Sequence, residues 1–320
     1  MSNQTAFAPI LSRLKRFEWR QNIIYIAFVA VFLLFAVLLR DSGFTNPNNL
    51  MNILRQTATI TVMAVAMTYV IAAAEIDLSV GSIAGLSSVV TAMSISSWGL
   101  VPGIMAGLSV GLVAGAISGG LVAWLKVPSF LVTLGMLGLL VGVARWITAS
   151  APIPIADQTY IAIFGGGQLG SVPTIFIWVT LVVGIGAIVM NKTKFGRHVR
   201  ATGGNLVAAG YTGVKTARVK FIVLMLSGGG AALAGMLYAG RLQSGRFQWG
   251  TGDELSVIAA VILGGTSLFG GRGQVIGSLF GAVFIGLINN GLILMGLDVS
   301  QQQVVRGAII ILAVALSRKK

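Results

Sequence analysis

Residues 75–82 read EIDLSVGS, and they separate two long apolar runs, ITVMAVAMTYVIAAA at 60–74 and IAGLSSVVTAM at 83–93. This short stretch carries two of the eight acidic residues in the chain, Glu75 and Asp77. Within a membrane, carboxylates are costly unless protein or water surrounds them. This polar interruption between apolar runs therefore indicates a functional segment of a membrane protein.

The composition of the whole chain supports the same interpretation. Of the 320 residues, 56 % are hydrophobic and 9 % are charged, and the mean hydropathy is +0.91, whereas soluble domains carry about 25 % charged residues. Apolar runs of about 20 residues recur from end to end and leave no room for a soluble domain. We expect one transmembrane domain over residues 22–316, with tails at 1–21 and 317–320.

Hydropathy and Pro, Gly and charge punctuation predict an all-α, polytopic fold with about ten membrane spans. The eighth span is short and rich in glycine, so it is expected to be broken or only partly inserted. The predicted spans are 22–39, 54–74, 80–97, 102–124, 128–148, 172–191, 219–240, 254–268, 274–296 and 302–316.

The basic residues predict the orientation of these spans. With a cytoplasmic N-terminus, the inner segments hold four basic residues in the N-tail, Lys126, seven from Lys192 to Lys220, Arg272 and three at the C-terminus. These are 16 of the 22 Lys and Arg residues. Because basic residues favour the cytoplasmic side, both termini are predicted to be cytoplasmic.

A short repeat suggests an internal duplication. Residues 80–85, VGSIAG, resemble residues 276–281, IGSLFG, at a separation of 196 residues. The same offset carries spans one to four close to spans seven to ten, with the orientation preserved. We therefore expect a parallel repeat of four helices, an arrangement that transporters use around a central path.

Several classes of function are excluded by what the sequence contains. The net charge of +14 lies in segments between spans, as topology requires, and not in a nucleic-acid-binding surface. There is no cysteine and only one histidine, so no catalytic or metal-ligating cluster is predicted, and neither is a cofactor. Residues 263–273, LGGTSLFGGRG, lack the Gly-Lys pair of a phosphate-binding loop, so this chain is not expected to bind ATP.

Two further groups of polar residues are candidate functional sites inside the bilayer. Asp77 is placed to cap the following helix by accepting from the backbone of Ser79 or Val80, and Glu75, Asp77 and Ser79 together form a candidate inner-mouth motif. Asn289 and Asn290 interrupt the ninth span. Their amides either hydrogen-bond to neighbouring helices or line a wet translocation path, and the sequence leaves both alternatives open.

The cytoplasmic segment 192–218 is the longest polar stretch between spans. From Asn205 to Tyr211 it is short and Ala-rich, and it is bounded by Gly203-Gly204 and Gly213, which predicts a short helix across the membrane face held by glycine turns. A basic loop that only anchors to anionic lipid is the alternative.

Taken together, EIDLSVGS, GGNLVAAGYTG at 203–213, LGGTSLFGGRG and GLINNGL at 286–292 resemble the permease subunits of ribose-type sugar importers of the ATP-binding-cassette (ABC) class. The family commonly has glycine where Glu75 stands, so a role carried over from the family is safer for Asp77. The resemblance implies that segment 192–218 couples to an ATPase. The residues assigned to this coupling are Gly203, Gly204, Asn205, Ala208, Ala209, Gly210 and Gly213.

The same resemblance implies the partners and the location. They are a second copy of the chain, a cytoplasmic ATPase with tandem cassettes that binds ATP and Mg²⁺, a periplasmic sugar-binding protein and the lipid of a bacterial inner membrane. The implied function is import of a ribose-like monosaccharide. The alternatives are a branched-chain amino-acid or nucleoside permease of the same superfamily and an ion-coupled secondary transporter.

Overall fold

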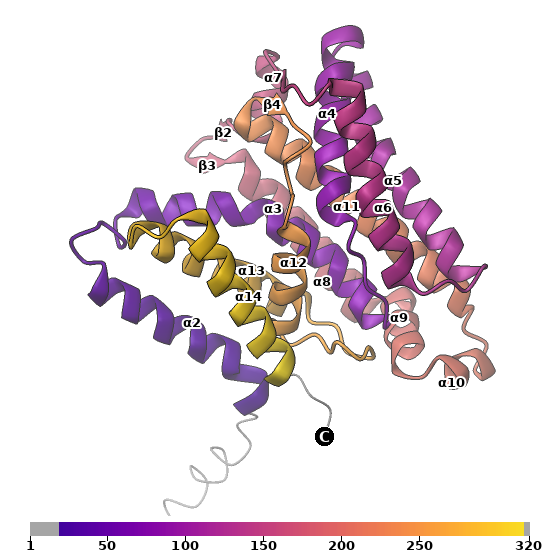
Figure 1. Ribbon diagram of the computed structural model, residues 1–320. Coiled ribbons are helices and arrows are strands. Elements are labelled where there is room, and N and C mark those ends of the chain that lie inside the picture. Colours follow the sequence, from indigo (N-terminus) through magenta and orange to yellow (C-terminus); the bar gives the residue numbers. More distant parts are fainter. Residues whose placement is uncertain (1–18, 317–320) are drawn as a thin grey trace, which may run out of the picture.

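The computed structural model describes residues 19–316, so most of the predicted N-tail at 1–21 and all of the C-tail at 317–320 lie outside the described residues. The described chain is an all-α membrane protein with a few two-residue strands (Figure 1). The helices are α2 (Trp19–Leu38), α3 (Pro47–Ala72), α4 (Val80–Trp98), α5 (Leu100–Ala123), α6 (Ser129–Thr148), α7 (Gln158–Phe164), α8 (Thr174–Lys192), α9 (Lys194–Gly204), α10 (Leu206–Tyr211), α11 (Thr216–Leu242), α12 (Asp253–Leu263), α13 (Val275–Leu294) and α14 (Val299–Leu316).

Two small antiparallel strand pairs close loops between helices. In the first, β1 (Ile153–Pro154) pairs with β4 (Ser244–Gly245), which joins the connection after α6 to the connection after α11. In the second, β2 (Gln168–Leu169) pairs with β3 (Val172–Pro173) just before α8. The hydropathy pattern did not indicate these strands or the short helix α7.

Each of the ten predicted spans overlaps one helix. Within the described residues, seven helices are long and apolar enough to cross a membrane, namely α3, α4, α5, α6, α8, α11 and α13. The eighth predicted span corresponds to α12, which has only 11 residues. At about 1.5 Å per residue, α12 alone covers about half of a hydrocarbon core.

The glycines of α5 allow close packing against two neighbouring helices. Gly103 and Gly107 face α4, and Gly111, Gly115 and Gly119 face α11. A β-carbon on Gly111 would collide with the carbonyl oxygen of Gly228. Such contact between backbones stabilises helix pairs in lipid, where no hydrophobic effect drives them together. This glycine stripe is therefore used within the chain.

Helix α4 begins near the middle of the bundle. The Ser87 hydroxyl donates to the carbonyl oxygens of Gly107 and Ala232, at 2.9 and 3.1 Å. Helix α5 is about 36 Å long, and Gly107 lies about 10 Å from its start. Ser87 of α4 lies beside Gly107, and Val80, where α4 begins, lies about 10 Å from Ser87 along α4, away from the start of α5. Residues 73–79 complete this crossing as non-helical chain.

A second broken crossing meets the first. The segment 244–252 descends along α4, with Gly245 against Ser88, Phe247 against Gly85 and Gly250 against Gly81. Helix α12 then starts at Asp253, beside the first turn of α4. The eighth span is thus a non-helical segment of turns followed by a short helix. The first turns of α4 and α12 meet inside the bundle.

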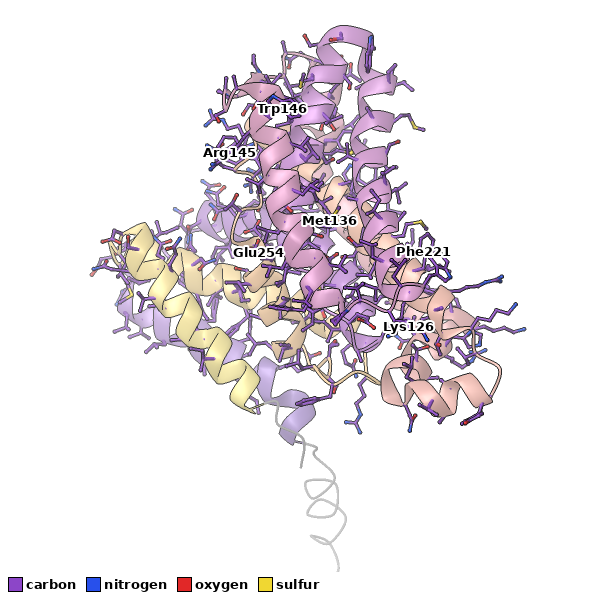
Figure 2. All side chains as sticks on the ribbon, turned by 45° about the vertical axis from the view of Figure 1, so that its right-hand side comes forward. Lys126, Met136, Arg145, Trp146, Phe221 and Glu254 are labelled. Atoms are coloured by element: carbon purple, nitrogen blue, oxygen red, sulfur yellow. The ribbon has the colours of Figure 1, made fainter. Side chains whose placement is uncertain are left out.

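The two ends of the bundle are named here after a residue that lies at each. Figure 2 shows Lys126 toward one end and Arg145 with Trp146 toward the other, and these ends are called the Lys126 end and the Trp146 end. Helices α9 and α10 lie at the Lys126 end, whereas α7 and β4 lie at the Trp146 end (Figure 1).

Candidate functional site

Glu75, the first acidic residue of the broken crossing, forms an ion pair with Lys220 in the first turns of α11. The Glu75 side chain is buried, and Lys220 keeps about a fifth of its side chain exposed. A buried carboxylate needs such a partner. The pair ties the segment after α3 to the helix that follows segment 192–218.

Asp77 and Ser79 are buried in the same non-helical segment. The Asp77 carboxylate accepts from the Ser79 backbone at 2.9 Å and from the Ser79 hydroxyl at 2.6 Å. This is the backbone contact expected of Asp77 before α4. Both residues lie within the packed bundle, and their assignment to an inner mouth stays a prediction.

Helix α6 adds hydrogen bonds to the backbone of this segment. The backbone N–H groups of Ile76 and Leu78 donate to the hydroxyls of Ser129 and Thr133, each at 3.1 Å. Non-helical backbone within a membrane is tolerated when neighbouring side chains satisfy it. The first turn of α6 therefore stabilises the break in the α3–α4 crossing.

The segment 192–218 contains the predicted short helix, α10. Asn205 caps it, because its side-chain oxygen accepts from the backbone of Ala208 at 3.0 Å. Gly213 has a φ of 85° where the chain turns toward α11, as expected for a glycine turn. Gly203 and Gly204 differ from expectation, since they form the last turn of a second helix, α9, which the sequence analysis missed.

The residues assigned to ATPase coupling divide into exposed and buried positions. Gly204, Asn205, Ala208, Gly210 and Gly213 are exposed, and so are the larger neighbours Leu206, Val207 and Tyr211. Gly203 and Ala209 are buried, and Ala209 is only 4 % exposed. Ala209 therefore packs against this chain, so it is not available to a partner in this conformation.

Three segments that are distant in the sequence meet at Gly203. A β-carbon at Gly203 would collide with the Ala72 carbonyl oxygen at the end of α3. The same carbonyl accepts from the Gly271 backbone at 3.0 Å, and both Gly270 and Gly271 have a φ of 80°. The glycine-rich segment 263–273 therefore turns tightly against α3 and α9 and fixes the base of α10.

Asn290 is used in helix packing. Its amide and that of Asn49 exchange two hydrogen bonds of 2.9 Å, which join α13 to α3. Asn289 lies one position earlier on α13 and lines a cavity of about 500 Å³. Asn290 thus takes the hydrogen-bonding alternative, and a part of Asn289 in translocation stays a prediction.

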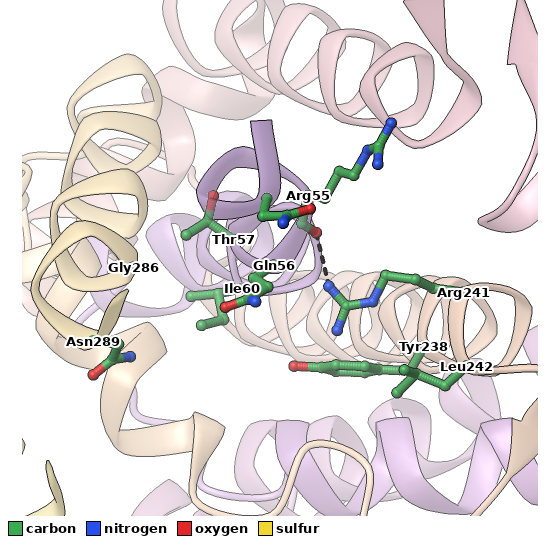
Figure 3. A pocket seen from close by; sticks show the side chains of 10 residues that line it. Arg55, Gln56, Thr57, Ile60, Tyr238, Arg241, Leu242, Gly286 and Asn289 are labelled. Carbon is green, nitrogen blue, oxygen red and sulfur yellow. Dashed lines mark hydrogen bonds between the residues drawn. The ribbon is translucent and has the colours of Figure 1, made fainter. Parts of the chain in front are cut away.

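The cavity beside Asn289 lies between α3, α11 and α13 (Figure 3). Its polar wall includes Arg55, Gln56, Tyr238 and Arg241. Arg241 donates to the backbone carbonyl of Arg55 at 3.0 Å, and the Tyr238 hydroxyl donates to Asp253 at 2.6 Å. This wall offers amide, guanidinium and phenol groups to a polar solute.

Sequence comparison places the chain among transport permeases. Residues 49–314 match the protein family described as branched-chain amino acid transport system / permease component. The chain belongs to this permease family. It is 42 % identical to the probable ABC transporter permease protein YphD of Escherichia coli over 94 % of this chain and 91 % of that protein.

Other relatives of the permease carry more specific names. It is 41 % identical to the ribose import permease protein RbsC of Bacillus subtilis, over 92 % of each chain. It is 34 % identical to the xylose transport system permease protein XylH of Escherichia coli, over 92 % of this chain and 91 % of that one. No solved structure matches the permease.

Sequence reasoning missed several residues of the permease that the structure brings together. Lys220 was counted only as a topological charge, although Glu75 and Lys220 were predicted on the same side of the membrane. Tyr238, Arg241 and Asp253 lay at the ends of two predicted spans, where they had no local pattern. Only the packing of α11 against the start of α12 makes them neighbours.

Proposed function

We propose that the permease is the membrane-spanning subunit of an ATP-driven importer for a monosaccharide. The strongest support for this proposal is that the chain is 41 % identical to a ribose import permease over 92 % of both chains. A xylose transport permease is related over a similar length. The polar cavity beside Asn289 suits a hydroxyl-rich solute, because its amides and guanidinium groups can pair with hydroxyls.

The proposed coupling element is α10, which would dock in a cleft of a cytoplasmic ATPase with tandem cassettes. Its support is the combination of exposed apolar residues, with Tyr211 89 % exposed, on a helix fixed at its base by α3 and segment 263–273. ATP and Mg²⁺ would be bound by that partner. A lipid-anchoring role of the basic residues is the alternative.

The proposed assembly contains two copies of the permease, the ATPase and a periplasmic sugar-binding protein in a bacterial inner membrane. We propose ten crossings with both termini in the cytoplasm and with the Lys126 end on the cytoplasmic side. In support, the three non-helical or short-helical segments 73–79, 192–215 and 264–274 all lie on the same predicted side, and they contact one another.

The parallel repeat belongs to the same proposal. Under the offset of 196, α2, α3, α4 and α5 correspond to α11, α12, α13 and α14. Gly81 and Gly85 pack against segment 247–250, and the matching Gly277 and Gly281 pack against Gly264 and Ala260 of the α12 region. The first pair belongs to the first copy of the repeat and the second pair to the second copy, and both pairs contact the eighth span.

An uptake assay in cells tests the substrate class. Cells lacking their own importers would express the permease with its ATPase and binding protein, and they would be offered labelled ribose, xylose, leucine and a nucleoside. The proposal predicts uptake of a pentose or related monosaccharide only. Uptake of leucine or the nucleoside would support the alternative suggested by the family description, and this would contradict the assignment to sugar.

A further inference from the structure

The non-helical segment 244–252 turns its polar side chains outward. Ser244, Gly245, Phe247 and Gly250 are buried, whereas Arg246, Gln248 and Thr251 are exposed, and Glu254 in the first turn of α12 is partly exposed. Ser244 and Gly245 belong to a strand pair, and the residues after them run in hydrogen-bonded turns, such as the one in which the Thr251 N–H donates to the Gln248 carbonyl at 3.0 Å. The four polar residues Arg246, Gln248, Thr251 and Glu254 are called the polar strip.

The inner face of the segment is fixed to α4. The Ser88 hydroxyl donates to the Arg246 carbonyl at 3.0 Å, and it lies 3.1 Å from the Arg246 backbone nitrogen. Gly85 and Gly81 allow the backbone of residues 247–250 to touch the helix. Arg145 of α6 also lies over the Phe247 ring, at 4.6 Å from its centroid. The direction in which the polar strip faces is therefore set by packing.

The polar strip reaches the middle of the bundle, where the first turns of α4 and α12 meet. Figure 2 shows Glu254 between α6 and the C-terminal helices, on the same side of the molecule as Arg145. The exposed side chains of α8 differ from the polar strip, because Leu181, Ile185 and Ile188 are apolar. A lipid-facing surface looks like α8, because charged and amide groups at this depth are costly in hydrocarbon.

Non-helical backbone at membrane depth occurs only where protein buries it or where it lines a water-filled space. From this we infer that the polar strip lines the hydrated path of the permease and forms a binding station for a neutral, polyhydroxylated solute. One guanidinium, one amide, one hydroxyl and one carboxylate alternate along it, so that it offers donors and acceptors without a large net charge.

Trp249, between Gln248 and Gly250, is partly exposed and adds an aromatic ring to the binding station. Arg246 lies over this ring, at 5.4 Å from its centroid. The choice of a monosaccharide as solute rests on the proposed function, whereas the hydration of the strip does not.

Single cysteines test the hydration directly, because the chain has none of its own. Gln248→Cys, Thr251→Cys and, as the lipid-facing control, Ile185→Cys would be made in the full importer complex in membranes. Each would be treated with a small, membrane-impermeant, negatively charged methanethiosulfonate. Ile185 is 59 % exposed, so that it matches the strip in exposure and differs in its surroundings.

We expect Gln248→Cys and Thr251→Cys to react at least about ten-fold faster than Ile185→Cys, because only thiolates in water react. Equal, slow reaction at all three positions would overturn the inference. This readout needs no substrate, so it fails independently of the proposed function.

A transport measurement tests the binding station. Gln248→Leu should raise the KM for uptake of the monosaccharide several-fold while the ATPase still co-purifies, because one hydrogen-bonding group is removed. Fast labelling together with an unchanged KM would show a hydrated wall without a binding station, and it would overturn that part of the inference.

Discussion

At the residue scale, the buried Glu75 carboxylate depends on its ion pair with Lys220. The pair joins the non-helical segment 73–79 to α11, the helix that follows α10. Movement of α10 would therefore act on the broken crossing through this contact.

Removal of one partner should destabilise the permease. Lys220→Met leaves the Glu75 carboxylate buried and unpaired, and we expect a loss of about 1–3 kcal/mol, below the full value for a deeply buried pair because Lys220 is partly exposed. The measurement is the midpoint of thermal unfolding in detergent. Lys215→Met, at an exposed position five residues earlier, is the control and should leave the midpoint unchanged.

The double variant Glu75→Gly, Lys220→Met separates pairing from packing. Because both charges are removed, its unfolding midpoint should lie above that of Lys220→Met alone. If the two substitutions simply add, the pair does not couple these residues.

At the scale of elements, substitutions can test two features, which are the close contact between α5 and α11 and the exposure of α10. Gly111→Leu must place a branched side chain where α5 touches the Gly228 carbonyl, so we expect a loss of at least about 1–3 kcal/mol. Gly138→Leu on α6 is the matched control, since a β-carbon there meets no atom within 4 Å. Detergent stability measured on both should fall only for Gly111→Leu, and an equal effect would refute this use of the stripe.

Helix α10 gives the next prediction. Val207 is 66 % exposed, so that Val207→Arg should leave folding intact and place a charge in the proposed ATPase contact. We expect association with the ATPase to weaken by about ten-fold or more, equivalent to about 1.4 kcal/mol, and uptake to fall with it. Ala201→Arg, at an exposed position of α9, adds the same charge outside α10.

Co-purification with the ATPase and an uptake assay check this prediction. Full retention of the ATPase by Val207→Arg would leave only the lipid-anchoring role for segment 192–218. Ala209 is unsuited to this test, because it is buried against the permease itself.

The sequence predicted the helices well where hydropathy alone decides them. The ends of α4 and α6 agree with the predicted spans within about two residues, because a long apolar run has only one stable form in lipid. The non-helical part of the eighth span was not predicted. Its residues, such as Phe247 and Trp249, carry no helix or strand period, and only contact with α4 places them.

The candidate site was predictable only where a residue acts on its neighbours in the sequence. Asn205 and Gly213 act locally, as a helix cap and a turn, so their types and spacing indicated their places. Gly203, Gly270 and Gly271 act through contacts across nearly seventy residues and more, which no local pattern contains. Lys220 and the cavity wall belong to this second kind.

At the scale of the whole molecule, the broken crossings of α4 and α12 meet between the Lys126 end, which bears α10, and the Trp146 end (Figure 1). This arrangement suits alternating access, in which a change at one end shifts the population of two packed states. The orientation has its own test. Lys215→Cys should be labelled only from the cytoplasm and Gln168→Cys only from outside, and the reverse pattern would invert the assignment of α10.

The central claim is that monosaccharide import through the permease is powered by ATP in a partner subunit. Its most direct test is uptake into proteoliposomes that contain the permease and its ATPase, with the binding protein and labelled ribose or xylose outside and ATP enclosed. The account predicts accumulation that requires both ATP and the binding protein and that is lost with Val207→Arg. Accumulation driven by a proton or sodium gradient without ATP would contradict it.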